Sequence, residues 1–200
     1  MKLKASVIVI LLIAASFSPA QAAPNYVFPV VGCDYTYAKA HHDYPATDIL
    51  AKAGCKYVAV TSGVIDEVNR VDSWSGKTNL GVDRGGLYVS FIGSDGVRYY
   101  ASHLRTIPLS IQPGVEVKAG RLLGTVGATG SARGTKPHIH FGLSWSTPSQ
   151  TWWVRRGMVW PCKYLDAWKA GKDLSPAKEV EAKRLKTGDV PPEPVNEKRK

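Results

Sequence analysis

Short hydrophobic runs separated by turn residues fill the middle of the chain. Runs rich in β-branched side chains cover residues 57–60, 63–68 and 87–92. A Gly-Ser-Asp-Gly turn at 93–96 then leads into a return run over 97–103. Two apolar runs joined by such a turn predict a β-hairpin. Because no long amphipathic helix pattern occurs within 26–146, we expect a mostly β domain of antiparallel hairpins.

Closely spaced glycines continue this pattern toward the C-terminus. They are Gly114, Gly120, Gly124, Gly127 and Gly130. Glycines at this spacing are typical of tight turns between short strands, such as the predicted strand over 122–126. Similar short hairpins occur in biotin- and lipoyl-carrier domains, but Lys118 lacks the Met-Lys-Met turn of a carrier, so only the all-β architecture is carried over. The segment 138–144 is predicted as a further strand.

The C-terminal third changes character. Trp152, Trp153 and Trp160 follow the strands, and we expect them to pack across the sheet, with lining of a substrate groove as the alternative. Residues 164–169 favour a short helix. From residue 173 the chain becomes polar, charged and proline-containing, which predicts a flexible charged tail over 173–200 with a transient helix near 178–186.

The N-terminus has the pattern of an export signal. Lys2 and Lys4 precede an apolar run over 5–15, and small residues follow at 19–23. The run is shorter than the roughly 20 residues of a membrane span, although an uncleaved anchor is the alternative. We expect cleavage after Ala22. The prediction is a secreted, periplasmic or cell-wall-associated protein with one domain over 23–172, whose core covers about 28–146.

Charge narrows the expected partners. The chain has 26 Lys and Arg against 16 Asp and Glu, and losing Lys2 and Lys4 with the signal leaves a formal +8. A basic exported protein suits an anionic surface such as a cell wall or a lipid headgroup layer. Nucleic acid is not expected as a partner, because no segment resembles a nucleic-acid-binding module.

Three cysteines are consistent with an oxidising compartment. Cys33 and Cys55 flank a histidine-containing segment, and their pairing is favoured because it would pin that segment. Cys162 would then remain unpaired. No Cys-x-x-Cys spacing occurs, so zinc ligation by the cysteines is not expected.

The histidines fall into three motif-like segments. The five are His41, His42, His103, His138 and His140. His138 and His140 are two apart on a predicted strand, so both side chains point to one face. A single histidine on a strand is usually structural, but here Asp48 accompanies the first segment. Two imidazoles and one carboxylate would leave the fourth position of a zinc ion open for water, as in catalytic zinc sites.

Taken together, these segments resemble the lysostaphin-like (LytM-type) zinc endopeptidases, a family of bacterial cell-wall hydrolases. The resemblance covers about 28–144. Its markers are the segments 42–48, 59–63 and 99–104, the Pro-Gly-x-x-Val-x-x-Gly-x-x-Leu-Gly pattern at 113–124, and 130–141 with its final His-Ile-His-Phe. The resemblance implies a compact domain like the duplicated hybrid motif, and a bound Zn²⁺.

The resemblance also implies roles for individual residues. It assigns His42, Asp48 and His140 as metal ligands, and His103 and His138 as the catalytic pair that acts on the water and the developing oxyanion. Which of the pair is the general base stays open. For two further residues, Tyr100 and Arg98, a place near the cleft and a structural role are both consistent with the sequence.

One spacing departs from the family pattern. The family places three residues between the first histidine and its aspartate, whereas five separate His42 from Asp48. The extra residues must loop out, and Pro45 suits a turn there. His41 is therefore an alternative ligand, and Asp43 a weaker substitute for Asp48.

These inferences predict an exported zinc endopeptidase that hydrolyses amide bonds in peptidoglycan peptides. The alternative is a non-catalytic wall-binding or hydrolase-activating protein of the same fold, although every matching His and Asp position is retained. A third hypothesis is a peptidase for foreign proteins such as elastin-like or glycine-rich chains, because the loops around a metal site determine its substrate.

Overall fold

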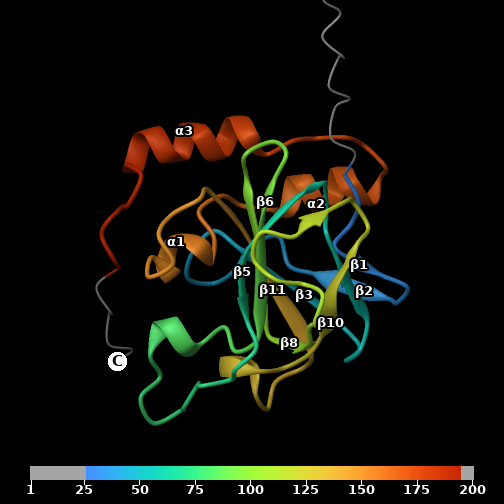
Figure 1. Ribbon diagram of the computed structural model, residues 1–200, viewed down its shortest axis with the longest axis vertical. Helices are drawn as coiled ribbons and strands as arrows, with labels where there is room; N and C mark the ends of the chain where they lie inside the picture. The colour runs from blue at the N-terminus through green and yellow to red at the C-terminus, as the bar shows by residue number, and fades with distance from the viewer. Residues whose placement is uncertain (1–25, 195–200) are drawn as a thin grey trace, which may run out of the picture.

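Two antiparallel sheets make up the body of the protein. The computed structural model describes residues 26–194. The larger sheet has the strand order β2-β3-β11-β7-β6-β5-β9, and the smaller has the order β1-β4-β10-β8 (Figure 1). This arrangement is the mostly β, antiparallel fold that the sequence predicts.

The larger sheet holds the longest strands. Its members are β2 (Tyr35–Tyr37), β3 (Thr47–Ala51), β11 (His138–Ser144), β7 (Arg98–Ser102), β6 (Tyr88–Gly93), β5 (Gly63–Asn69) and β9 (Glu116–Val117). The predicted hairpin around 93–96 is confirmed, since β6 pairs with β7 in antiparallel register. β11 lies between β3 and β7, so side chains on one face of β11 have neighbours from both strands.

The smaller sheet contains β1 (Val30–Val31), β4 (Lys56–Val58), β10 (Leu122–Val126) and β8 (Leu104–Thr106). Buried side chains from both sheets form one hydrophobic cluster, which includes Tyr57, Leu123, Phe91 and Phe141. Alternation along the strands explains this core: Ile139 and Phe141 face it, which leaves His138 and His140 for the opposite face of β11. Residues 57–58, 63–68 and 122–126 are strands, as predicted.

A disulfide joins Cys33 to Cys55, in agreement with the favoured pairing. The bridge closes a loop with a sequence separation of 22 residues. Both the His41–His42 pair and Asp48 lie within this loop. Cys162 is a free cysteine within residues 26–194.

Three α-helices follow the last strand in the described part of the chain: α1 (Trp152–Arg155), α2 (Cys162–Lys169) and α3 (Ala177–Thr187). α2 confirms the short helix expected over 164–169. Figure 1 shows α3 crossing the end of the larger sheet at which β6 turns into β7. Two 3-10 helices, η1 (Gly81–Asp83) and η2 (Gly130–Ala132), lie in loops before and after the β6–β10 region.

The segment after α2 differs from the flexible tail expected from its composition. Val180 of α3 is 3% exposed, and Tyr164 Oη donates a hydrogen bond to Glu179 at 2.7 Å. The indole N–H of Trp145 donates to the Asp189 carbonyl, and that of Trp153 donates to the Pro191 carbonyl. Composition alone underestimates this order because a few well-placed contacts hold a largely polar helix to the domain.

Within residues 26–194, no helix is long and apolar enough to cross a membrane. The predicted export signal at 1–22 and the last residues of the predicted tail lie outside the described residues.

Candidate functional site

Strand register brings Asp48 and His140 together. In the pairing of β3 with β11, His140 is opposite Asp48, and His138 is opposite Leu50. In the pairing of β11 with β7, His140 is also opposite Ser102. Directly opposed residues of antiparallel strands project to the same face. A metal-binding carboxylate and imidazole therefore meet across two strands that are far apart in the sequence.

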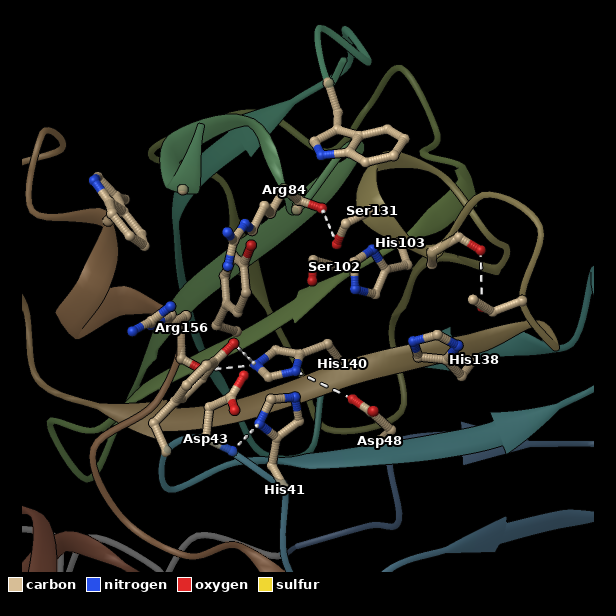
Figure 2. A pocket seen from close by; sticks show the side chains of 18 of the residues that line it. His41, Asp43, Asp48, Arg84, Ser102, His103, Ser131, His138, His140 and Arg156 are labelled. Carbon is tan, nitrogen blue, oxygen red and sulfur yellow. Dashed lines mark hydrogen bonds and ion pairs between the residues drawn. The ribbon is translucent and has the colours of Figure 1, made fainter. Parts of the chain in front are cut away.

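His41 completes this group. Ligand atoms of His41, Asp48 and His140 all lie within 4.8 Å of one another, and Figure 2 shows the three side chains converging. The ring centroids of His41 and His140 are 5.0 Å apart. The backbone N–H of His41 donates to the Ala46 carbonyl at 3.0 Å, which closes the loop that precedes β3. This set has the two imidazoles and one carboxylate of a three-ligand metal site.

His42, which the family resemblance assigns as the ligand, occupies a different position. Its side chain is 65% exposed, and its Nδ1 lies 2.8 Å from the Asp43 carboxylate. The structure thus places His41, the alternative, where the resemblance puts His42. The loop between the histidine pair and Asp48 determines which ring reaches Asp48, and sequence spacing does not reveal its path.

The hydrogen bonds of His140 suit a metal ligand. Nε2 lies 2.9 Å from the Arg156 carbonyl, so Nε2 carries the proton and donates to it. Nδ1 faces Asp48 Oδ1 at 3.2 Å. In a neutral ring, Nδ1 would then present a lone pair to an ionised carboxylate, which is also an acceptor. A second proton or a bound cation satisfies both atoms, and a backbone carbonyl behind the ring is a common support for a metal-ligating histidine.

The charge states of the group also suit cation binding. Burial would raise the pKa of Asp48, but its interaction with His140 and the nearby histidine rings outweigh burial and lower the pKa to about 2. Burial, followed by the neighbouring His140 ring, lowers the pKa of His41 to about 4. At neutral pH the site therefore offers the ionised carboxylate of Asp48 and the neutral imidazole of His41, the forms that bind metals.

Two further histidines line the same cavity. His103 Nδ1 and His138 Nδ1 each lie 2.8 Å from a backbone carbonyl, that of Thr129 and that of Lys136 respectively. Each Nδ1 thus donates a hydrogen bond, which leaves each Nε2 able to accept a proton. The two ring centroids are 4.9 Å apart. Burial, followed by the nearby rings of His140 and His138, lowers the pKa of His103 to about 3.

The backbone at His103 is unusual. Its φ is +63°, a left-handed conformation that is uncommon for residues other than glycine. The turn is held by the His103 N–H, which donates to the Gly85 carbonyl at 2.9 Å. Residues in such conformations cluster at functional sites, where surrounding contacts hold them in place. Here the turn directs the imidazole at the end of β7 into the cavity (Figure 2).

The cavity has a volume of about 600 Å³ and contains all five histidines in its lining. Sequence reasoning missed many of the other lining residues, among them Tyr44, Trp74, Arg84, Lys136 and Arg156. They come from loops without a periodic pattern, so the sequence carries no signal for them. Trp152 lines the cavity, as the groove alternative suggests, whereas Trp153 packs against the C-terminal segment.

Tyr100 and Arg98, whose roles the sequence leaves open, occupy different environments. Tyr100 lines the cavity. Arg98 is fully buried and its Nε lies 2.8 Å from the Asp66 carboxylate, so its role is structural.

Comparisons with known proteins identify the family of the chain. The model of Peptidase family M23 matches residues 42–151, which is more than half of the chain. A comparison with curated proteins finds no match.

Among solved structures, LytM of Ruminococcus gnavus has a TM-score of 0.57 and 20% identity, with 74% of this chain and 62% of that chain covered. Lysostaphin of Staphylococcus simulans has a TM-score of 0.53 and 24% identity, with 76% and 58% covered. A Pseudomonas aeruginosa protein assigned to peptidase M23 has a TM-score of 0.53 and 24% identity, with 76% and 55% covered.

The chain therefore spans little more than half the length of each of these three proteins. The similarity to them concerns the fold, while the family match rests on the sequence of residues 42–151. On these observations, the chain belongs to Peptidase family M23 and has the lysostaphin-like fold of that family.

Proposed function

We propose that the protein is an exported zinc-dependent endopeptidase that hydrolyses amide bonds in peptidoglycan peptides. The observation that carries this proposal is the convergence of His41, Asp48 and His140 beside His103 and His138 in one cavity. Membership of a peptidase family and the likeness in fold to lysostaphin support it. The M23 match also favours hydrolysis over the non-catalytic alternative, because the chain retains the whole histidine set.

Zinc fits the donor set better than harder cations do. Two imidazole nitrogens and one carboxylate oxygen are typical zinc ligands, whereas Ca²⁺ and Mg²⁺ prefer oxygen ligands. We assign His41, Asp48 and His140 as the residues that would hold the ion, with His42 outside the set. When bound, zinc would polarise the scissile carbonyl and make a hydroxide available near neutral pH.

The remaining histidines would then handle protons and charge. His103 and His138 each present an Nε2 that can accept a proton, because a backbone carbonyl fixes the proton at Nδ1. One of them would accept the proton of the attacking water, and the other, once protonated, would donate a hydrogen bond to the oxyanion. Both rings make the same kind of hydrogen bond through Nδ1, so kinetic measurements on variants are needed to assign the role of each.

Zinc content and cleavage of wall peptides test this proposal. The purified protein should bind about one zinc ion and release new amino termini from purified peptidoglycan, detected by mass spectrometry. His138→Ala should abolish cleavage while the circular dichroism spectrum stays unchanged, and Arg121→Ala, which alters an exposed side chain on another surface, should cleave normally. An active His138→Ala variant would exclude the catalytic role.

The substrate and the attachment to the wall have tests of their own. Assays with glycine-rich peptides as well as wall material distinguish a wall hydrolase from a peptidase that acts on foreign proteins.

The formal charge of the whole chain is +10, which supports electrostatic retention on an anionic wall. Retention should fall sharply as salt approaches roughly 1 M, where the screening length is only about 3 Å. Equal retention at low and high salt would contradict it.

A further inference from the structure

Two arginines line the cavity near His140. Arg84 follows η1, and Arg156 follows α1. Figure 2 shows both on the same side of His140, with His103 and His138 on the other side. Both line the cavity, although 72 residues of sequence separate them. Such a pair of guanidinium groups beside a peptidase site calls for a chemical explanation.

Contacts with neighbouring side chains hold each arginine in place. The Arg156 guanidinium lies 3.7 Å from the ring centroid of Tyr44 and 4.9 Å from that of Trp152. Arg84 Nε donates to Asn79 Oδ1 at 3.1 Å. Arg156 is held by stacking on rings and Arg84 by a neutral amide, so the positive charge of each group remains available. A guanidinium group held in this way loses little further entropy when it binds an anion.

Arg84 and Arg156 differ from neighbouring arginines in their contacts with carboxylates. Two other arginines nearby do have carboxylate partners, since Arg155 pairs with Glu67 and Arg133 with Asp72. Within residues 26–194, neither Arg84 nor Arg156 has an ion pair of this kind.

The lining of the cavity contains two acidic residues. They are Asp43 and Asp48. Asp43 attracts Arg156 but contacts His42, and Asp48 belongs to the metal-binding group. The like charges of Arg84 and Arg156 repel each other, and a bound anion would relieve this repulsion.

We propose that Arg84 and Arg156 form a subsite for a carboxylate of the substrate peptide. This inference rests on the proposed peptidase function and deepens it. It assigns the enzyme to peptides that carry a free carboxylate near the scissile bond, rather than to neutral glycine-rich peptides. A guanidinium group recognises a carboxylate through two parallel hydrogen bonds, and Arg84 and Arg156 would bind it from two elements, which fixes the peptide relative to His140.

Chemically matched peptides test this subsite. Soluble peptides released from peptidoglycan are labelled with a neutral fluorophore, and half are amidated so that carboxylates become carboxamides. Binding to the zinc-loaded protein is measured by fluorescence anisotropy, and cleavage is measured by mass spectrometry. The variants are Arg84→Gln, Arg156→Gln, the double variant and Arg156→Lys, with Arg121→Gln as the control for loss of one exposed positive charge.

The wild-type protein and Arg121→Gln should bind the carboxylate peptides roughly tenfold or more tightly than the amidated ones, as expected for hydrogen bonds between charged groups. Each single Gln variant should lose most of this preference, and the double variant should lose all of it. Arg156→Lys should keep part of it, because lysine retains the charge without the planar fork. Binding of the amidated peptides should be the same in all six proteins.

Two results would overturn the subsite: equal binding of both peptide forms by the wild-type protein, or a preference that persists in the double variant. Binding and cleavage together separate this inference from the proposed function. Cleavage without a carboxylate preference would refute the subsite and keep the peptidase. A preference in binding that the double variant abolishes, with no cleavage by any protein, would keep the subsite and refute hydrolysis.

Discussion

The ring of His41 meets the ring of His140 edge-on, with an interplanar angle of 87° and 5.0 Å between centroids. His41 belongs to an irregular loop and His140 to β11, an inner strand of the larger sheet. The contact matters because the family resemblance assigns the neighbouring His42 as the ligand. A loop that bulges before β3 turns His41 toward Asp48 and leaves His42 at the surface.

This geometry predicts that His41, and not His42, determines zinc affinity. Loss of a residue that only supports a ligand typically costs 10- to 100-fold in metal affinity, so His41→Ala should weaken zinc binding by roughly 100-fold or more. His42→Ala should bind zinc like the wild-type protein. Competition with a chelator of known affinity measures both constants. The opposite result would show that the loop rearranges when the metal binds.

A second prediction concerns the left-handed backbone of His103. Glycine adopts this conformation without the steric cost of about 1–2 kcal/mol per residue that other residues bear. His103→Gly and His103→Ala both lose the hydrogen bond to Thr129, so their difference isolates the backbone. His103→Gly should therefore be the more stable by about 1 kcal/mol in urea denaturation. Ser102, within β7, serves as the control: there Ser102→Ala should be more stable than Ser102→Gly. If the glycine variant were the more stable at both positions, or the alanine variant at both, a strained turn at His103 would be contradicted.

A third prediction concerns the close approach of Gly81 to Trp152. A Cβ at Gly81 would lie 2.1 Å from the Trp152 ring, so Gly81→Ala must displace the indole. Because Arg156 stacks on this indole, the displacement should raise KM for wall peptides several-fold. At Gly76 a Cβ would lie 3.5 Å from its nearest neighbour, an ordinary contact, so Gly76→Ala serves as the control. Equal KM values for the two variants would show that the position of Trp152 does not affect substrate binding.

A fourth prediction links Asp72 to acid stability. Burial would raise its pKa, but the Gly130 N–H and Arg133 donate hydrogen bonds to the carboxylate and outweigh burial, so the pKa is lowered. A carboxylate with a lowered pKa in the folded state stabilises the protein above its unfolded pKa, near 4. This contribution is lost as the pH falls through the folded value.

Asp72→Asn should therefore be less stable than the wild-type protein at pH 7, by about 1–2 kcal/mol. The difference should shrink as the pH falls below about 4. Thermal denaturation across this range measures it, and Asp34→Asn, which removes an exposed negative charge, corrects for the change in net charge. A difference that stays constant with pH would mean that packing, rather than charge, explains the effect.

A fifth prediction concerns the disulfide. The Cys33–Cys55 bridge closes a loop of 22 residues, and replacing both cysteines by serine should destabilise the protein by about 3 kcal/mol. Zinc affinity should also fall, because His41 lies in this loop and would have to be ordered on binding. Cys162→Ser, which removes the free thiol, is the matched control. Unchanged zinc affinity in the double variant would show that the sheet alone positions the ligands.

Much of the fold could be predicted from local patterns. Period-two alternation over 138–144 fixes which side chains face the core, because strand geometry leaves them only two directions. The Asp95-Gly96 turn similarly specifies the hairpin of β6 and β7. The order of the C-terminal segment could not be predicted in this way, since it depends on tertiary contacts such as Tyr164 with Glu179.

The sequence by itself determined the β architecture, the residue types of a metal site and the family resemblance, because these depend on periodicity and on chemistry that is visible at each position. Only the tertiary structure decided that His41 faces Asp48 and that Arg84 and Arg156 share a wall. Those relationships depend on loop paths and strand pairing between distant segments. Such paths are set by packing of the whole domain, so no local pattern records them.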